Sequence, residues 1–176
     1  MTAAASRLLL AAAFVLSAAG AARAGRDAIR VGVLGDESGQ FADLGGPGSV
    51  LAAKMAAEQF GNRVNGKPIE ILSADTQNKP DIASGIARRW FEVEGVDAIA
   101  DLPVTSVAFA VQDLAREKKK VLLINAAAAA ELTGEACSPY TIHWQDDSRA
   151  LSVGTTPAVL ASGLKRSFFL TPDYAW

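Results

Sequence analysis

The stretch GVDAIADLPVTSVAFAVQDLAREKKKVLLIN, residues 95–125, decides the fold class. Its first part is a short apolar segment that ends at Asp101 and predicts a buried strand. A helix is expected from about Ser106, a residue type that favours the N-cap position. The apolar face of this helix consists of Val107, Ala110, Val111 and Leu114. Residues 121–125 then predict a second strand, so that a helix connects two parallel strands.

The same alternation extends to both sides of this unit. Further strands are expected at 29–34, 68–75, 140–144 and 167–171, and further helices at 49–60, 81–91 and 148–161. Gly61 is placed to end a helix, and Asn65-Gly66 is a strong turn signal. Strands that alternate with helices predict an α/β fold, a parallel sheet with helices on both faces.

The first 24 residues predict a secretory signal peptide. Arg7 precedes the apolar run at 8–22, and small residues flank Arg23 at the expected cleavage site after Ala24. The alternative is an uncleaved, membrane-anchoring helix. Cleavage would export the mature chain, and its expected location is the periplasm.

The charge balance argues against nucleic acid and anionic membranes as partners. Removal of the signal takes away Arg7 and Arg23, which leaves 15 basic against 19 acidic residues and a net charge of −4. The basic cluster at 116–120 falls where a helix should end, a position that favours cations.

The residue types needed for catalysis are sparse. His143 is the single histidine, and no nucleophile motif accompanies it, so we expect a partly buried, hydrogen-bonded side chain. No metal-ligand set or phosphate-binding loop is present, and no cofactor is expected. The acidic pairs 36–37 and 146–147 are expected to be solvated. These patterns indicate a binding protein and not an enzyme.

Two features raise the question of what lies beyond this chain. The segment SFFLTPDYAW, residues 167–176, ends without a helix to cover its strand, so we expect a C-terminally truncated protein. Cys137 is the single cysteine, either a free thiol or half of a disulfide whose partner is elsewhere.

Five consecutive alanines, 126–130, follow the strand that ends at Asn125. Alanine is the best helix former, so propensity alone predicts that a helix begins there. The alternative is a loop at the carboxyl end of a strand, where open α/β sheets bind ligands through backbone groups.

Several segments together resemble one family. IRVGVLGDESGQFADLGGPGSVLAAKMAAEQFG, GKPIEILSADTQNKPDIASGIARRWFE, GVDAIADLPVTSVAFAVQDLAREKKKVLLIN and FFLTPDYAW are similar to periplasmic substrate-binding proteins of ABC transporters. The nearest branch is that of the leucine/isoleucine/valine-binding (type I) proteins and their amide- and aromatic-acid-binding relatives. The resemblance implies a two-lobed clamshell, with an incomplete first lobe at 25–136 and the start of a truncated second lobe at 137–176. It also implies a membrane permease as partner and a monomer when complete.

Carried over position by position, the resemblance implies these ligand-binding residues: Phe41, Leu44, Val104, Thr105, Ser106, Ala127, Ala128, Ala129 and Tyr174. Val104 replaces a residue that is usually polar, and Ser106 is alternatively an N-cap. Phe41 and Leu44 alternatively pack under their loop. The alanine loop lacks the family's usual hydroxyl side chain, so it would bind the ligand through main-chain groups alone. Arg149 stands where relatives often have an aromatic residue, and either suits a more acidic ligand or is exposed.

The function implied is that of an extracytoplasmic component of an ABC importer for an amino acid or amino-acid-like molecule, which it binds by clamshell closure. Branched-chain amino acids, amides and aromatic acids are the candidate ligands. Two alternatives stay open: a ligand-sensing module of a receptor or regulator, and a small α/β hydrolase that uses His143.

Overall fold

The computed structural model describes residues 27–164, 166, 168 and 170. The predicted signal peptide at 1–24 and the predicted ligand residue Tyr174 lie outside the described residues. Of the predicted strand at 167–171, Phe168 and Leu170 are described, and neither is in a strand. Within the described part of the chain, no helix is both long enough and apolar enough to cross a membrane.

A single six-stranded sheet forms the centre of the fold, in the order β2-β3-β1-β4-β5-β6. The strands are β1 (Ile29–Gly35), β2 (Arg63–Val64), β3 (Lys67–Asp75), β4 (Ala98–Asp101), β5 (Val121–Ile124) and β6 (Thr141–His143). All neighbouring pairs are parallel except β2 and β3. This confirms the predicted parallel sheet, to which the structure adds β2. The Asn65-Gly66 turn, with φ of 49° and 80°, joins β2 and β3 as a hairpin.

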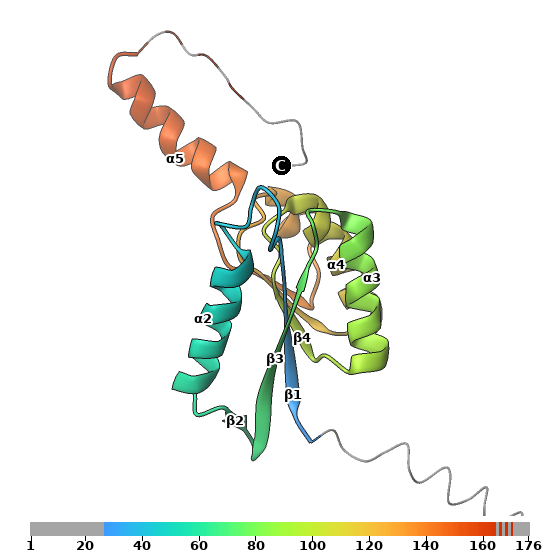
Figure 1. Cartoon of the computed structure of the whole chain (residues 1–176). Coiled ribbons are helices and arrows are strands. Elements are labelled where there is room, and N and C mark those ends of the chain that lie inside the picture. The colour runs from blue at the N-terminus through green and yellow to red at the C-terminus, as the bar shows by residue number, and fades with distance from the viewer. Residues whose placement is uncertain (1–26, 165, 167, 169, 171–176) are drawn as a thin grey trace, which may run out of the picture.

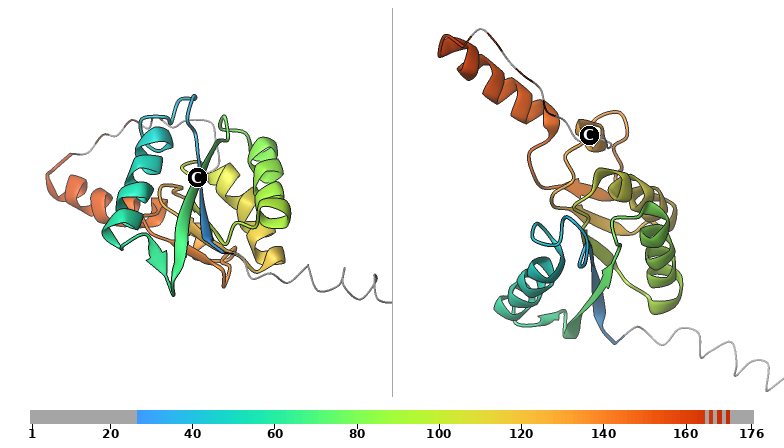
Figure 2. Two further views of the ribbon diagram at one scale, coloured as in Figure 1. Left: turned by 60° about the horizontal axis from the view of Figure 1, so that its bottom comes forward. Right: turned by 45° about the horizontal axis from the view of Figure 1, so that its top comes forward.

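Helices cover the sheet from both sides, as predicted. The covering helices are α2 (Gly46–Gln59), α3 (Pro80–Arg89) and α4 (Thr105–Lys118), with a π-helical turn η2 (Trp90–Glu94). A 3₁₀ turn η3 (Ala130–Leu132) and the helix α5 (Ser148–Ala161) follow in the chain. Figure 1 shows α2 on one side of the sheet and α3 and α4 on the other. The tilted views in Figure 2 show the same division, with α5 projecting away from the body.

One predicted helix start and one predicted N-cap were wrong. The first helix begins at Gly46 and not at Ser49, because Pro47 has the backbone angle of a helical first turn. The helix after β4 begins at Thr105, and its N-cap residue is Val104, with no side-chain cap. Ser106 is therefore inside the helix and is not its N-cap.

The predicted end of α2 at Gly61 is confirmed. Gly61 has a φ of 87°, which glycine adopts without steric cost. Its N–H donates to the Glu58 carbonyl at 2.9 Å, and the Asn62 N–H donates to the Ala57 carbonyl at 2.7 Å. This pair of bonds is the Schellman motif, which satisfies the last carbonyls of a helix.

The basic cluster at 116–120 lies at the end of α4, also as predicted, and two of its lysines pair with acidic side chains. Lys118 Nζ is 2.8 Å from Glu92 Oε1, and Lys120 Nζ is 3.5 Å from Asp97 Oδ1. These contacts give the cluster a structural role.

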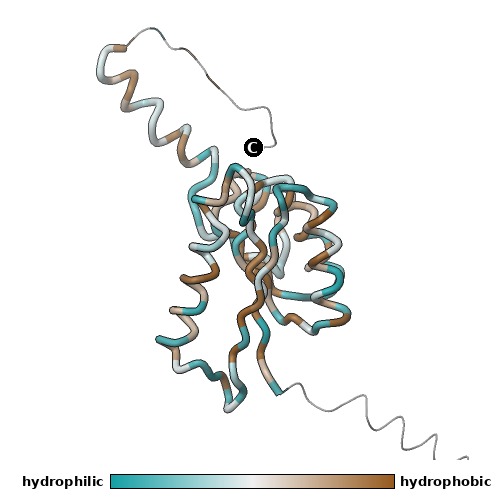
Figure 3. Tube along the Cα trace, in the orientation of Figure 1, coloured by the Kyte–Doolittle hydropathy of each residue, from teal (hydrophilic) through white to brown (hydrophobic). Residues whose placement is uncertain are grey.

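The two faces of the sheet are buried unequally. Against α3 and α4, the side chains of Trp90, Ile99 and Val107 are almost completely buried. On the opposite face α2 leaves Phe60 exposed and forms a groove of about 520 Å³ with the strands. Figure 3 shows hydrophobic residues concentrated along the central strands, which form the floor of this groove.

Candidate ligand-binding site

The loops expected to bind ligand lie at one edge of the sheet, because parallel strands end at the same side. They follow β1 (36–45), β3 (76–79), β4 (102–104) and β5 (125–129). Figure 1 shows this edge at the top of the sheet, next to the start of α5.

Asp36 shapes the loop after β1. Its carboxylate is fully buried and accepts the N–H groups of Gly39 at 2.9 Å and Phe41 at 3.0 Å. The expectation that Asp36 is solvated was therefore wrong, because the loop folds its backbone donors around this side chain. Phe41 packs against the core, whereas the Leu44 side chain is 62% exposed at this edge.

Asp75, at the end of β3, ties the same loop to the neighbouring strand. It accepts the Ser38 hydroxyl at 2.5 Å and the N–H groups of Glu37 at 2.9 Å and Gln77 at 2.8 Å. These bonds, led by that from Ser38, hold the pKa of Asp75 below its usual value. A carboxylate that stays ionised therefore fixes the loop after β1, a role that we did not predict.

Thr105 connects the loop after β4 to the alanine loop. Its buried hydroxyl oxygen accepts the Ala128 N–H at 3.3 Å. Val104 is also buried, and Ser106 is half-buried. No side chain caps α4, so the first N–H groups of this helix stay available at the edge where the strands end, called the ligand edge below. The structure thus brings together two loops that are separate in the sequence.

Residues 127–129 form a loop and not the first turn of a helix, as the second of the two interpretations predicted; η3 begins only at Ala130. The Ala127 and Ala129 side chains are buried in the core, which suits small apolar residues. The Ala128 carbonyl accepts the Ser148 N–H at 2.8 Å. The N–H groups of Ala127 and Ala129 donate to no group of the described residues.

His143 supports this loop. Its Nε2 is 2.6 Å from the Ala127 carbonyl oxygen, and the side chain is half-buried. This confirms the expected hydrogen-bonded, partly buried histidine.

Asp101, at the end of β4, is the second buried carboxyl group at this edge. It is 1% exposed, and burial raises its pKa from 3.8 to about 6, against the opposing effects of the Ser49 hydroxyl and the Gly46 N–H. Its Oδ2 atom has no hydrogen-bond partner among the described residues. An aspartate at a strand end gave no sequence signal for such burial.

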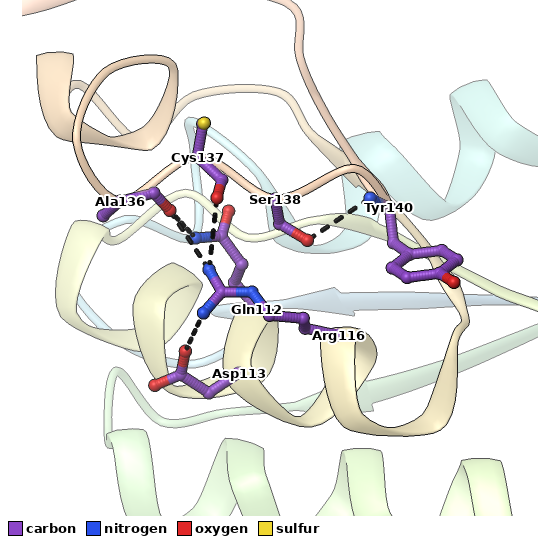
Figure 4. A network of polar contacts seen from close by, with 7 residues as sticks. All are labelled: Gln112, Asp113, Arg116, Ala136, Cys137, Ser138 and Tyr140. Atoms are coloured by element: carbon purple, nitrogen blue, oxygen red, sulfur yellow. Dashed lines mark hydrogen bonds and ion pairs between the residues drawn. The ribbon is translucent and has the colours of Figure 1, made fainter.

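Figure 4 shows how α4 holds the segment that leads from η3 to β6. Gln112 Nε2 donates to the Ala136 carbonyl at 2.7 Å, and Arg116 donates to the carbonyls of Ala136 at 3.3 Å and Cys137 at 3.4 Å. Cys137 is exposed, with a free thiol. Arg149 is exposed near the start of α5 and lines a shallow hollow with Asp147.

The described residues hold no cluster of three or more histidine, cysteine, aspartate or glutamate side chains that would bind a metal ion. Besides the carboxyl groups of Asp36, Asp75 and Asp101, the groups gathered at this edge are hydroxyls, backbone N–H groups and apolar side chains. Such groups bind small molecules through hydrogen bonds and apolar contacts.

A family model for periplasmic binding proteins matches residues 28–176. The chain belongs to this family. Among curated proteins, this periplasmic binding protein is 27% identical over 149 residues to the Leu/Ile/Val-binding protein homolog 6 of Brucella abortus. The match covers 84% of this chain and 37% of that relative.

Two solved structures extend this comparison. A periplasmic binding protein from Burkholderia mallei is 43% identical, with a TM-score of 0.75 over 79% of this chain and 37% of its own. A solute-binding protein of an ABC transporter from R. palustris, in complex with 4-hydroxybenzoate, is 27% identical, with a TM-score of 0.68 over 77% of this chain and 36% of its own. The present chain therefore spans well under half the length of these relatives, and it has the type I periplasmic-binding-protein fold.

Proposed function

We propose that this chain provides first-lobe ligand contacts of an extracytoplasmic solute-binding protein, which delivers a small carboxylate to an ABC permease. The observation that carries the proposal is the convergence of backbone donors at one edge. The uncapped start of α4 lies next to the Thr105–Ala128 contact and to the N–H groups of Ala127 and Ala129, which donate to no group of the described residues. Helix N-termini and free N–H groups bind carboxylates.

The named ligands of the relatives fit this chemistry. Leucine, isoleucine, valine and 4-hydroxybenzoate, which appear in the names of the relatives, all have a carboxylate next to an apolar group. We propose that the carboxylate meets the donors of α4 and the alanine loop. Leu44 and Phe41 would contact the apolar part. The alanine loop has no side-chain hydroxyl for an α-ammonium group, so the choice among amino acids, amides and aromatic acids depends on contacts outside this loop.

Binding would proceed by closure of two lobes around the ligand, without a covalent step. β6 belongs to the same sheet as β1, so we place the lobe boundary after β6 and not at 136/137. The second lobe would then begin with α5, and Tyr174 would close over the ligand. We further propose export to the periplasm by the signal at 1–24, and a monomer when both lobes are present.

The proposal can be tested with leucine and 4-hydroxybenzoate, each paired with its carboxamide, by following backbone amide NMR signals of the chain. We expect the two carboxylates at millimolar concentration to shift the signals of Thr105, Ser106, Ala127 and Ala129, because these N–H groups meet the anion. The carboxamides should shift them much less. Equal shifts from acid and amide, or shifts confined to other parts of the chain, would contradict the proposed site.

A further inference from the structure

Asp101 lies where three segments of the ligand edge meet. Asp101, the last residue of β4, and the following Leu102 have φ values of 87° and 61°. The Leu102 N–H donates to the Leu34 carbonyl at 3.2 Å, and the Asn125 N–H donates to the Asp101 carbonyl at 2.9 Å. Two consecutive non-glycine residues with positive φ are costly, and they persist only where the surroundings hold them in place.

The side chain of Asp101 occupies a space that two glycines, Gly35 and Gly45, leave open. A Cβ atom added at Gly35 would lie 2.5 Å from Asp101 Oδ2, and one at Gly45 would lie 3.0 Å from it. Gly46, with a φ of 55°, begins α2 next to them. The carboxyl group is therefore enclosed by the two ends of the loop that follows β1.

We infer that Asp101 is a positioning residue, whose buried carboxyl group sets the loop after β1 (36–45) against the loop after β4 (102–104). The inference rests on the proposed function, in that these two loops supply Leu44 and the start of α4 to the ligand. Because Asp101 is 1% exposed, it acts through Gly35 and Gly45 and through the Ser49 hydroxyl of α2.

Protonation of the Asp101 carboxyl group should change both loops with pH, a response that packing alone would not give. Besides burial, the groups that act on its pKa are the Ser49 hydroxyl and the Gly46 N–H, and neither is charged. Because the pKa lies at about 6, the carboxyl group changes its charge between about pH 5 and about pH 7. If Asp101 couples the loops, both should respond to that change together.

The first test is a pH titration of backbone amide signals in the full chain without ligand. In wild type, the signals of Gly45, Leu44 and Thr105 should shift with one common midpoint near pH 6. Asp101→Asn should abolish the response in both loops, whereas Asp113→Asn, at an exposed position on α4, should leave it intact. If Asp101→Asn does not fold, the test rests on whether the two loops of wild type share one midpoint. Different midpoints in the two loops, or a response that persists in Asp101→Asn, would overturn the inference.

The second test is a double-mutant cycle that joins Gly45→Ala with Asp101→Gly, a change that removes the carboxyl group and tolerates the positive φ. Gly45→Ala should lower the Tm of wild type by several degrees and should lower it much less when the carboxyl group is absent. Gly48→Ala is the control, since nothing lies within 4 Å of a Cβ there, and its effect should be equal in both backgrounds. An equal effect of Gly45→Ala in both backgrounds would refute the contact. Neither test involves ligand, so failure here is distinct from failure of the proposed function.

Discussion

At the scale of single residues, the Thr105 hydroxyl joins the start of α4 to the alanine loop. Thr105→Val keeps the shape of the side chain but leaves the Ala128 N–H without its acceptor. We expect the free energy of unfolding to fall by about 1–2 kcal/mol, the usual result when a partly buried donor loses its partner. Urea denaturation measures this change. Thr133→Val is the matched control, because the Thr133 hydroxyl is exposed and bonds only within its own turn; an equal loss in both variants would contradict the assignment.

Asp101 makes the chain less stable as the pH rises. The folded state holds this proton more tightly, since the pKa is raised from 3.8 to about 6. Between these pH values the unfolded state has lost the proton while the folded state retains it, so this contribution to stability falls as pH rises and is constant above about 6. Over the full pH range, the rise of the pKa from 3.8 to about 6 corresponds to about 3 kcal/mol of the free energy of unfolding.

We therefore expect the free energy of unfolding of wild type to fall by about 2.5 kcal/mol, relative to that of Asp101→Asn, between urea denaturation at about pH 4 and at about pH 7.5. The difference in free energy of unfolding between wild type and Asp113→Asn should change little with pH, because the Asp113 side chain is 76% exposed. If the difference in free energy of unfolding between wild type and Asp101→Asn is the same at both pH values, the Asp101 carboxyl group is not buried as described.

At the scale of elements, two glycines should respond in opposite directions to the same substitution. Gly61 ends α2 with a φ of 87°, so Gly61→Ala should destabilise the chain by about 1 kcal/mol. Gly85 lies inside α3, is exposed and has nothing within 4 Å of an added Cβ. Gly85→Ala should therefore stabilise the chain by about 0.5–1 kcal/mol. Thermal unfolding of both variants checks the signs, and the same sign for both would be inconsistent with the helix ends described above.

At the scale of the whole molecule, the unequal covering of the sheet leaves an apolar surface. Ile142 and Trp144, in and just after β6, are 50% and 81% exposed. Apolar patches of this kind bind hydrophobic dyes and promote association. The double variant Ile142→Thr, Trp144→Gln should lower the fluorescence of bound anilinonaphthalene sulfonate and reduce association in light scattering. Val93→Thr, which removes a single exposed apolar residue in η2, should change neither; an unchanged signal in the double variant would show that another surface binds the dye.

Much of the fold followed from local sequence patterns. Apolar strand segments and the helical spacing of Val107, Val111 and Leu114 predicted the alternating elements, because periodicity reflects which side of an element is buried. Gly61 and the Asn65-Gly66 turn were also predictable, since their backbone angles depend on residue type. The short strand β2 was missed, because two residues are too few for any periodic pattern.

For the candidate site, the sequence by itself placed Thr105 and the alanine loop at strand ends, and so at the same edge of a parallel sheet. Only the tertiary structure decided that the Thr105 hydroxyl accepts from Ala128, that Asp36 and Asp101 are buried, and that Asp75 fastens the loop after β1. The physical reason is that the state of a carboxylate depends on which donors surround it. Those donors come from loops that are distant in the chain and meet only when the sheet assembles.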